Sequence, residues 1–195
     1  MTPDSKRSYT NLLRKLVFRP VTWEHLEYIH DLHSRPEVDE HNTLGIPKDL
    51  KETKDFLATI ISEWNMDEQS VYEWSVFIKD SDEFIGIAGM RSAKNRFMRG
   101  EIFYNILPEQ WGQGYGTEIG NWLLRFGFED LNLHRIEAGV AIDNTRSIAL
   151  LEKLGMTREG IRRKILPIRG EWRDNYHYSI LEEEYFAKRS AQRQG

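Results

Sequence analysis

The sequence predicts one mixed α/β domain of the α+β kind, because two hydrophobic periods alternate along a single uninterrupted chain. In the first third, apolar residues recur at every third or fourth position, as on one face of a helix. From about residue 73 the period changes to two, which is typical of strands with one buried face. The 195 residues contain no internal repeat and no linker-like stretch, so the length fits one domain. We therefore expect a mixed sheet flanked by helices.

The first third of the domain is predicted to hold an edge strand and two helices. A short apolar run over residues 15–21 contains Pro20, which suits an edge strand. Thr22 can cap a helix with an apolar residue every three positions, and Pro36 ends that helix. A polar loop over residues 35–47 follows and leads into a second amphipathic helix.

The remaining elements follow from alternating periods and from turn residues. In the third of these strands, for example, Ile102, Tyr104 and Ile106 share one face. Gly155 is expected to end a helix, and Gly170 to form the last turn. The predicted strands cover residues 73–79, 83–90, 100–107, 135–142, 162–168 and 172–181, and the helices cover 117–129 and 147–154. We place the domain at 15–185, after a polar N-terminal arm (1–14) and before a charged tail (186–195).

Composition excludes several classes of protein. Lys and Arg total 27 against 31 for Asp and Glu, and this net charge of −4 argues against a basic nucleic-acid binder. The sequence has no apolar run long enough to span a membrane and no secretion signal, so we expect a cytoplasmic protein without a membrane partner. The absence of cysteine excludes disulfides, thiolate metal sites and a cysteine nucleophile. No His-Glu-x-x-His pattern indicates a metal site either.

The most specific local feature is the segment PEQWGQGYGT, which runs from Pro108 to Thr117 between a predicted strand and a predicted helix. Gly112, Gly114 and Gly116 let the backbone turn several N–H groups toward one point, and the helix N-terminus adds positive potential. The segment therefore suits a phosphate or pyrophosphate, although a tight turn is the alternative. No lysine follows, which excludes a Walker loop, and Thr117 breaks the dinucleotide fingerprint. The remaining template is a coenzyme A pyrophosphate loop.

Four segments together resemble the GNAT superfamily of N-acetyltransferases, and within it the ribosomal-protein alanine N-acetyltransferases. The segments are WGQGYGTE at 111–118, LHRIEA at 133–138, DNTRS at 143–147 and LGM at 154–156. The resemblance is dense over residues 84–160, and its order of elements extends over 16–185. It implies a twisted, mostly antiparallel sheet of about seven strands with about four helices, and acetyl-CoA in the splay between the fourth and fifth strands. Trp111 departs from the family's Gln or Arg, a change that this branch tolerates.

The resemblance also implies which residues bind the cosubstrate, acetyl-CoA, and it implies no metal. Backbone N–H groups of the glycine loop would hold the pyrophosphate, and the end of the preceding strand would pair with the pantetheine arm. Asn144 would hydrogen-bond the pantetheine or position the acceptor. The acetyl-CoA-binding residues expected in this way are Ile106, Leu107, Gly112, Gln113, Gly114, Tyr115, Gly116, Thr117 and Asn144.

Acetyl transfer to an amine requires a neutral amine, a stabilised oxyanion and a protonated leaving thiol. Because the pKa of an amine is about 7.7–10.4, a base must remove a proton. Glu101 is our candidate base, although an ideal strand separates it from Leu107 by about 20 Å, which requires a water relay. Tyr104 is a nearer polar relay, and Ser147 matches the family's position for a hydroxyl that protonates the thiolate. Glu101 as an exposed strand-end carboxylate and Ser147 as an ordinary helix-start serine are the alternatives.

We expect an N-acetyltransferase whose acceptor is an amine on a protein, a peptide or a small molecule. Nucleic acid would be met only through a ribosomal substrate, and a homodimer is possible. The alternative is a catalytically inert acyl-CoA-binding regulatory module, because Leu151 replaces the tyrosine acid of many family members. The absence of cysteine and of a Gly-x-Ser-x-Gly elbow favours direct transfer without an acetyl-enzyme. The polar loop at 35–47 is expected to cover the acceptor entrance.

The last predicted hairpin carries a cluster of basic residues with two readings. In the first, the cluster binds an acidic substrate, the 3′-phosphate of coenzyme A or ribosomal RNA. In the second, it is a solvated strand edge that discourages pairing with other strands. Its members are Arg162, Arg163, Lys164, Arg169 and Arg173.

Overall fold

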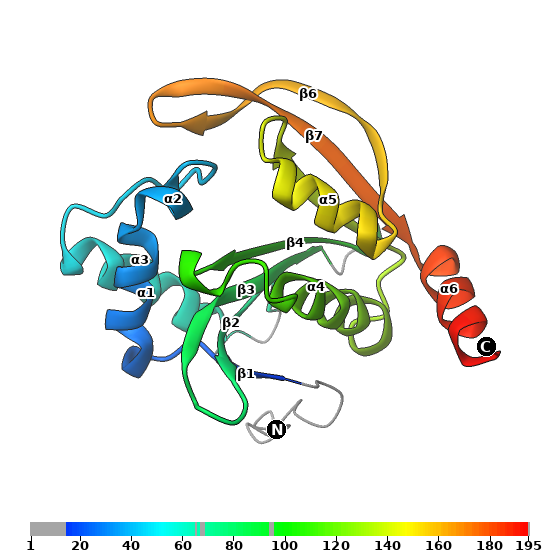
Figure 1. Ribbon diagram of the computed structural model, residues 1–195, viewed down its shortest axis with the longest axis horizontal. Helices are drawn as coiled ribbons and strands as arrows, with labels where there is room; N and C mark the ends of the chain where they lie inside the picture. The colour runs from blue at the N-terminus through cyan, green and yellow to red at the C-terminus, as the bar shows by residue number, and fades with distance from the viewer. Residues whose placement is uncertain (1–14, 65, 67–68, 94–95, 195) are drawn as a thin grey trace.

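One twisted seven-stranded sheet organises the chain, with strands in the order β1-β2-β3-β4-β5-β7-β6 (Figure 1). The computed structural model describes residues 15–64, 66, 69–93 and 96–194, so the arm predicted for residues 1–14 lies outside them. Neighbouring strands are antiparallel except β4 and β5, which are parallel. The strands are β1(Leu16–Pro20), β2(Val71–Ile78), β3(Phe84–Ala93), β4(Arg99–Ile106), β5(Arg135–Ala141), β6(Thr157–Ile168) and β7(Glu171–Leu181). The predicted mixed, mostly antiparallel fold is confirmed.

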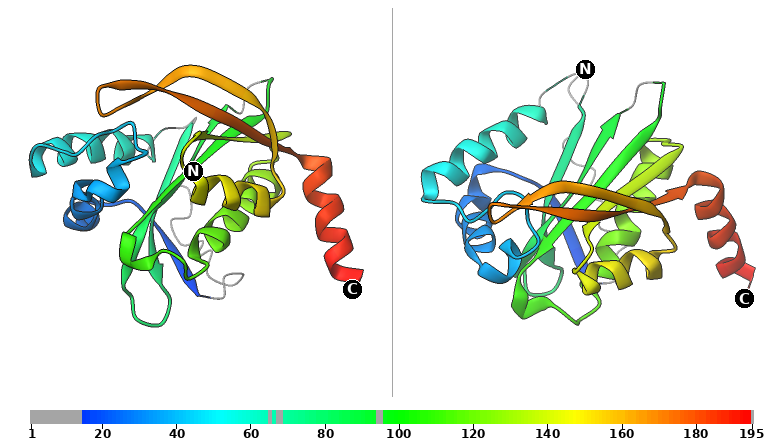
Figure 2. Two further views of the ribbon diagram at one scale, coloured as in Figure 1. Left: turned by 45° about the horizontal axis from the view of Figure 1, so that its top comes forward. Right: turned by 90° about the horizontal axis from the view of Figure 1, so that it is seen from above.

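Helices cover both faces of the sheet (Figure 2). Adjacent residues Val76 and Phe77 of β2 belong to different hydrophobic clusters, so the two clusters lie on opposite faces. One cluster includes residues of α1 and α3, and the other includes residues of α4 and α5. The α-helices in the described residues are α1(Leu26–Ser34), α2(Pro36–Asp39), α3(Leu50–Glu63), α4(Tyr115–Arg125), α5(Thr145–Leu154) and α6(Glu182–Gln194).

Aromatic packing fixes α4, the helix that follows the glycine loop. Trp74 of β2 is 1% exposed and meets the rings of Trp122 and Phe126 edge-on, with centroid distances of 4.7 and 4.9 Å. Trp122 also stacks on Phe18 of β1 at 4.0 Å. Offset and edge-to-face ring pairs add to the energy of burial, so α4 is held firmly against the sheet. The N-terminus of α4 is thereby positioned at the end of β4.

Several predicted boundaries differ from the structure. The helix predicted after Thr22 begins with a 3-10 turn and becomes α1 at Leu26. The expectation of an unbroken loop over residues 35–47 was wrong, because Pro36 occupies the first turn of α2. The helix predicted over 117–129 is divided between α4 and a π-helical turn over Phe126–Asp130. Strand β6 starts at Thr157, five residues before its predicted start.

The C-terminal tail is helical, which the sequence analysis did not predict. Its first turn carries three glutamates, which suit the positive end of a helix dipole. Tyr185 anchors the helix by stacking on Phe128 with a centroid distance of 4.9 Å. None of the helices in the described ranges is long and apolar enough to span a membrane.

Candidate active site

The parallel strands β4 and β5 separate soon after they meet. They pair at only three positions, of which the last is Glu101 opposite Glu137, although β4 continues to Ile106 and β5 to Ala141. Beyond Glu101, the edge of β4 that faces β5 therefore has no neighbouring strand. Its backbone N–H and C=O groups are available to an extended ligand, as in β-strand addition.

The glycine loop lies at the open end of this splay. Gly112 and Gly114 have φ of +77° and +86°, and a Cβ at either position would meet no atom within 4 Å. The amides of Thr117 and Glu118 donate to the carbonyl of Gly114. In the described chain, the amides from 112 to 116 have no intramolecular acceptor. Together with the helix N-terminus, these donors form a site for an anion.

Trp111 and Arg146 flank this loop, and their pairing was not predicted. The Trp111 indole N–H donates to the carbonyl of Ile106 at 2.8 Å, which ties the loop to the end of β4. The guanidinium of Arg146 lies 4.3 Å from the centre of the Trp111 ring, a cation–π contact. The sequence signal that could have predicted this pairing is the position of Arg146, two residues after Asn144. Its guanidinium places positive charge beside the anion site.

Tyr104 and Ser147 meet across the splay. The Tyr104 hydroxyl is 3.3 Å from Ser147 Oγ, which joins β4 to the first turn of α5. Asn144 caps α5 by accepting a hydrogen bond from the Ser147 amide at 3.1 Å. Burial raises the pKa of Tyr104, and the hydrogen bond to Ser147 opposes that shift. The phenol therefore stays protonated at neutral pH and is able to donate.

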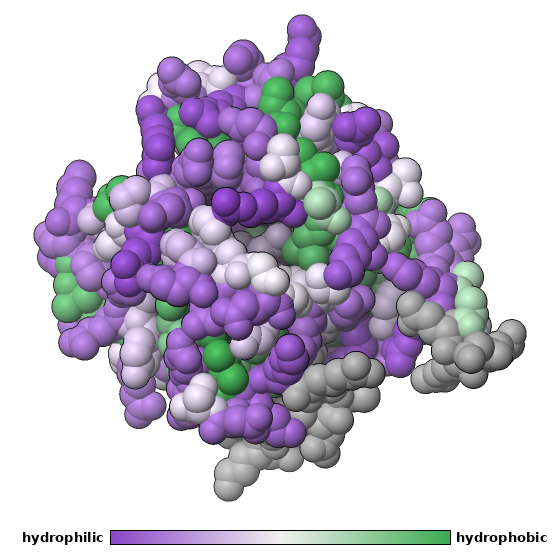
Figure 3. Space-filling model, in the orientation of Figure 1, coloured by the Kyte–Doolittle hydropathy of each residue, from purple (hydrophilic) through white to green (hydrophobic). Residues whose placement is uncertain are grey.

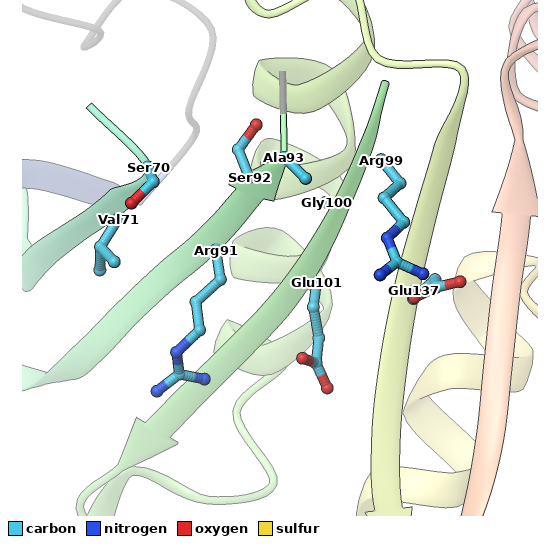
Figure 4. Close-up of a pocket in the computed structure, with 9 residues that line it drawn as sticks. All are labelled: Ser70, Val71, Arg91, Ser92, Ala93, Arg99, Gly100, Glu101 and Glu137. Atoms are coloured by element: carbon cyan, nitrogen blue, oxygen red, sulfur yellow. The ribbon is translucent and has the colours of Figure 1, made fainter. Parts of the chain in front are cut away.

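Glu101 lies apart from that pair, on the other face of the sheet. It lines a cavity of about 300 Å³ with Arg91, Arg99 and Glu137, and its side chain extends beside that of Arg91 (Figure 4). Within the described residues, its carboxylate has no hydrogen-bond or ion-pair partner. Because side chains alternate along a strand, Glu101 and Tyr104 flank the start of the splay from opposite faces.

Comparison with known proteins identifies the family of this chain. The family model for the acetyltransferase (GNAT) domain matches residues 15–157. The chain belongs to the GNAT family. A Bacillus licheniformis N-acetyltransferase, p20, is 32% identical over 171 residues, which cover 88% of this chain and 95% of that protein. The spermidine N(1)-acetyltransferase of Escherichia coli K12 is 25% identical over 170 residues, covering 87% of this chain and 88% of that enzyme.

Solved structures agree with this assignment. A GNAT-family acetyltransferase from Bacillus anthracis superposes with a TM-score of 0.76 and 27% identity, covering 88% of this chain and 98% of that one. Spermidine N-acetyltransferase from Vibrio cholerae, in complex with CoA and spermine, has the same fold, with a TM-score of 0.77 at 23% identity. It covers 88% of this chain and 98% of that one. The predicted family and fold are confirmed, and this GNAT protein is an N-acetyltransferase.

In this GNAT enzyme, Glu137 is already engaged, unlike Glu101. Burial would raise its pKa, but a 2.8 Å ion pair with Arg135 and the charges of His177 and Arg99 outweigh it, and the pKa is lowered. Glu137 is therefore ionised and already paired with Arg135. Of the two carboxylates that line the cavity, Glu101 is the one without an ion-pair partner in the described residues.

Glu73 is a buried acid that the sequence analysis missed. It is 3% exposed on β2, and burial raises its pKa from 4.5 to about 7 against the opposing charge of Arg91. Its position in an alternating strand hid it, since polar residues in such strands usually face solvent.

We expect Glu73 to destabilise the fold above neutral pH. The folded chain holds this proton to a higher pH than the unfolded chain does, so the contribution to stability is full below about pH 4.5 and is lost by about pH 7. The loss amounts to about 3 kcal/mol. Urea unfolding of Glu73→Gln at pH 5 and pH 8 should therefore show a smaller fall in stability than the wild type shows. Glu101→Gln, at an exposed position, is the control; an equal fall in Glu73→Gln and wild type would contradict the prediction.

Proposed function

We propose that this enzyme moves an acetyl group from acetyl-CoA directly to an amine, with acetyl-CoA bound in the splay between β4 and β5. The observation that carries the proposal is the row of unpartnered amides from 112 to 116 beside the unpaired edge of β4. The first suits a pyrophosphate and the second suits a pantetheine arm. Ile106 and Leu107 stand at the end of β4, and Gln113, Tyr115 and Thr117 belong to the glycine loop and the first turn of α4, which supports their expected role in binding.

The two faces of the splay support a division of roles. Glu101 takes a proton from the acceptor ammonium through water, and the neutral nitrogen attacks the thioester carbon. The new C–N bond forms as the C–S bond breaks. Tyr104 gives a proton to the departing sulfur, and Ser147 supports that donor by its hydrogen bond. The product nitrogen gives up its remaining extra proton through water to the Tyr104 phenolate, which restores the acid. Asn144 positions Ser147 through the helix cap.

The proposed acceptor is a protein or peptide N-terminus first, and a small amine second. Relatives carry names of both kinds: a putative ribosomal N-acetyltransferase of Bacillus subtilis is 28% identical over 130 residues, and the spermidine enzymes are described above. An amine acceptor is a cation at neutral pH, and the free carboxylate of Glu101 is complementary to it. A cytoplasmic location and a homodimer stay predictions.

A panel of free amines tests the proposal by the thiol that each releases from acetyl-CoA. The panel contains peptides with free N-termini, lysine peptides blocked at the N-terminus and polyamines, and the matched blanks are the same compounds already acetylated. Because the chain contains no cysteine, it adds no background thiol. At least one free amine should release thiol and gain an acetyl group. If acetyl-CoA binds and no amine reacts, the protein is an inert acyl-CoA-binding module.

A further inference from the structure

The hairpin of β6 and β7 extends beyond the rest of the sheet as an arm and arches toward α2 (Figures 1 and 2). Its turn contains Arg169, whose guanidinium forms a 2.8 Å ion pair with Asp39 of α2. Arg169 also donates to the carbonyl of Pro36 at 2.7 Å. The tip of the arm is thus attached to the segment between α1 and α3, 130 residues away in sequence.

A second group of contacts attaches the same segment to the β5–α5 turn. Asp143 in that turn forms a 3.0 Å ion pair with Arg173 of the arm, and its Oδ1 lies 3.5 Å from His41 Nδ1. On the β4 side of the splay, Arg35 lies 3.7 Å from Glu109, just before the glycine loop. We call these contacts the rim: Arg35–Glu109, Asp39–Arg169 and His41–Asp143–Arg173.

The rim joins the α1–α3 segment to both sides of the open splay and to the arm. In the same orientation, the space-filling view shows a mostly hydrophilic periphery with paler and apolar side chains gathered near the middle (Figure 3). An amine that reaches the splay from this side must pass the rim. Two of the five basic residues of the hairpin, Arg169 and Arg173, therefore pair with acidic residues of the same chain. These two do not form the free, solvated strand edge that was one of the predicted roles of the cluster.

We propose that the Arg169–Asp39 pair is a clamp that keeps the rim closed and so selects acceptors that present their amine on a slender, extended end. This inference rests on the proposed function, because it takes the splay as the place where acceptor and acetyl-CoA meet. Arg169 is a specificity-determining residue in this proposal and touches no reacting atom.

Burial gives this clamp more weight than a surface ion pair has. Exposed pairs contribute little to stability, but the Asp39 side chain is only 7% exposed, and its Oδ1 atom has no hydrogen-bond partner in the described structure. Removing Arg169 leaves a buried, uncompensated carboxylate, which is strongly unfavourable. Because α2 is a four-residue helix at the surface, it can relieve the cost by turning Asp39 toward water, which opens the rim.

Kinetics of Arg169→Ala test the selection of acceptors. We expect KM for a slender amine to rise about tenfold and KM for acetyl-CoA to stay within about twofold, since a tenfold change needs only a modest loss of interaction. Activity toward a folded protein with an accessible N-terminus should rise relative to the slender amine. Arg169→Lys should restore most of the wild-type preference. Arg163→Ala, on the exposed part of the same arm, is the matched control and should change neither KM.

A distance measurement reads the clamp without any acetyl transfer. Spin labels at Glu40→Cys and Ile165→Cys are specific, because the chain has no other cysteine, and both positions are exposed. The distance distribution should be narrow with Arg169 present and broader or longer with Arg169→Ala. Equal distributions, or an unchanged acceptor KM, would overturn the clamp. If no amine is acetylated but the distributions differ, the proposed function and the selection of acceptors fail, and only the attachment of the arm by Arg169 stands.

Discussion

Replacing Gly114 with valine should weaken acetyl-CoA binding by at least about 100-fold. Gly114 has φ of +86°, a region that β-branched residues avoid, and its missing Cβ faces open space at the mouth of the splay. A valine there both rotates the neighbouring amides and fills the proposed place of the pyrophosphate. Each lost hydrogen bond to a charged group is worth about 1.5–3 kcal/mol, so two account for the expected change. Calorimetric titration with acetyl-CoA measures it.

Gly45→Val is the matched control for backbone strain. Gly45 has φ of +76° and equally open surroundings, but it lies in the loop before α3. The substitution should lower stability about as much as Gly114→Val and leave acetyl-CoA affinity unchanged. An unchanged affinity in Gly114→Val would show that the loop is only a tight turn.

Tyr104→Phe should lower kcat by about 10²–10³ while both KM values stay near those of the wild type. The phenol is the only acid that we assign to the departing sulfur, and general acid catalysis contributes about 10²–10⁴. Ser147→Ala should cost less, because Tyr104 keeps its proton and loses only its hydrogen-bond partner. Steady-state kinetics with the best amine of the panel give both values.

The pH profile separates this acid role from a packing role. Because burial raises the Tyr104 pKa, the alkaline fall in kcat should lie above the ordinary tyrosine pKa of about 10 and should disappear in Tyr104→Phe. Tyr28→Phe, at a 52% exposed tyrosine on α1, is the control and should keep the wild-type profile. An unaltered kcat in Tyr104→Phe would show that another group protonates the departing sulfur.

Local signals were enough to predict most elements and the glycine loop. Period-two and helical patterns located the strands and helices, and Gly155 and Gly170 were found in the positive-φ positions expected of them. The signals failed where packing overrides pattern. The early start of β6 follows from pairing with β7. The charged last helix is held by the buried Tyr185, by an ion pair between Arg189 and Glu129, and by Lys188, which donates to the carbonyl of Leu154.

Contacts between distant residues could not be predicted in the same way. Tyr104 and Ser147 are 43 residues apart, and their separate predicted roles gave no sign that they touch. Arg169 was predicted only as part of a basic cluster, because nothing local links it to Asp39. Such pairs depend on how the fold brings distant segments together, which one sequence does not encode locally.

The most direct test of acetyl-CoA-dependent direct transfer is an initial-velocity study in which acetyl-CoA and the best amine are both varied. The chain has no cysteine and no serine elbow to carry the acetyl group, and we therefore propose that both substrates are bound together. We predict intersecting double-reciprocal lines, acetylated amine as product and no thiol release without the amine. Parallel lines with an acetylated protein, or thiol release that is independent of the amine, would contradict it.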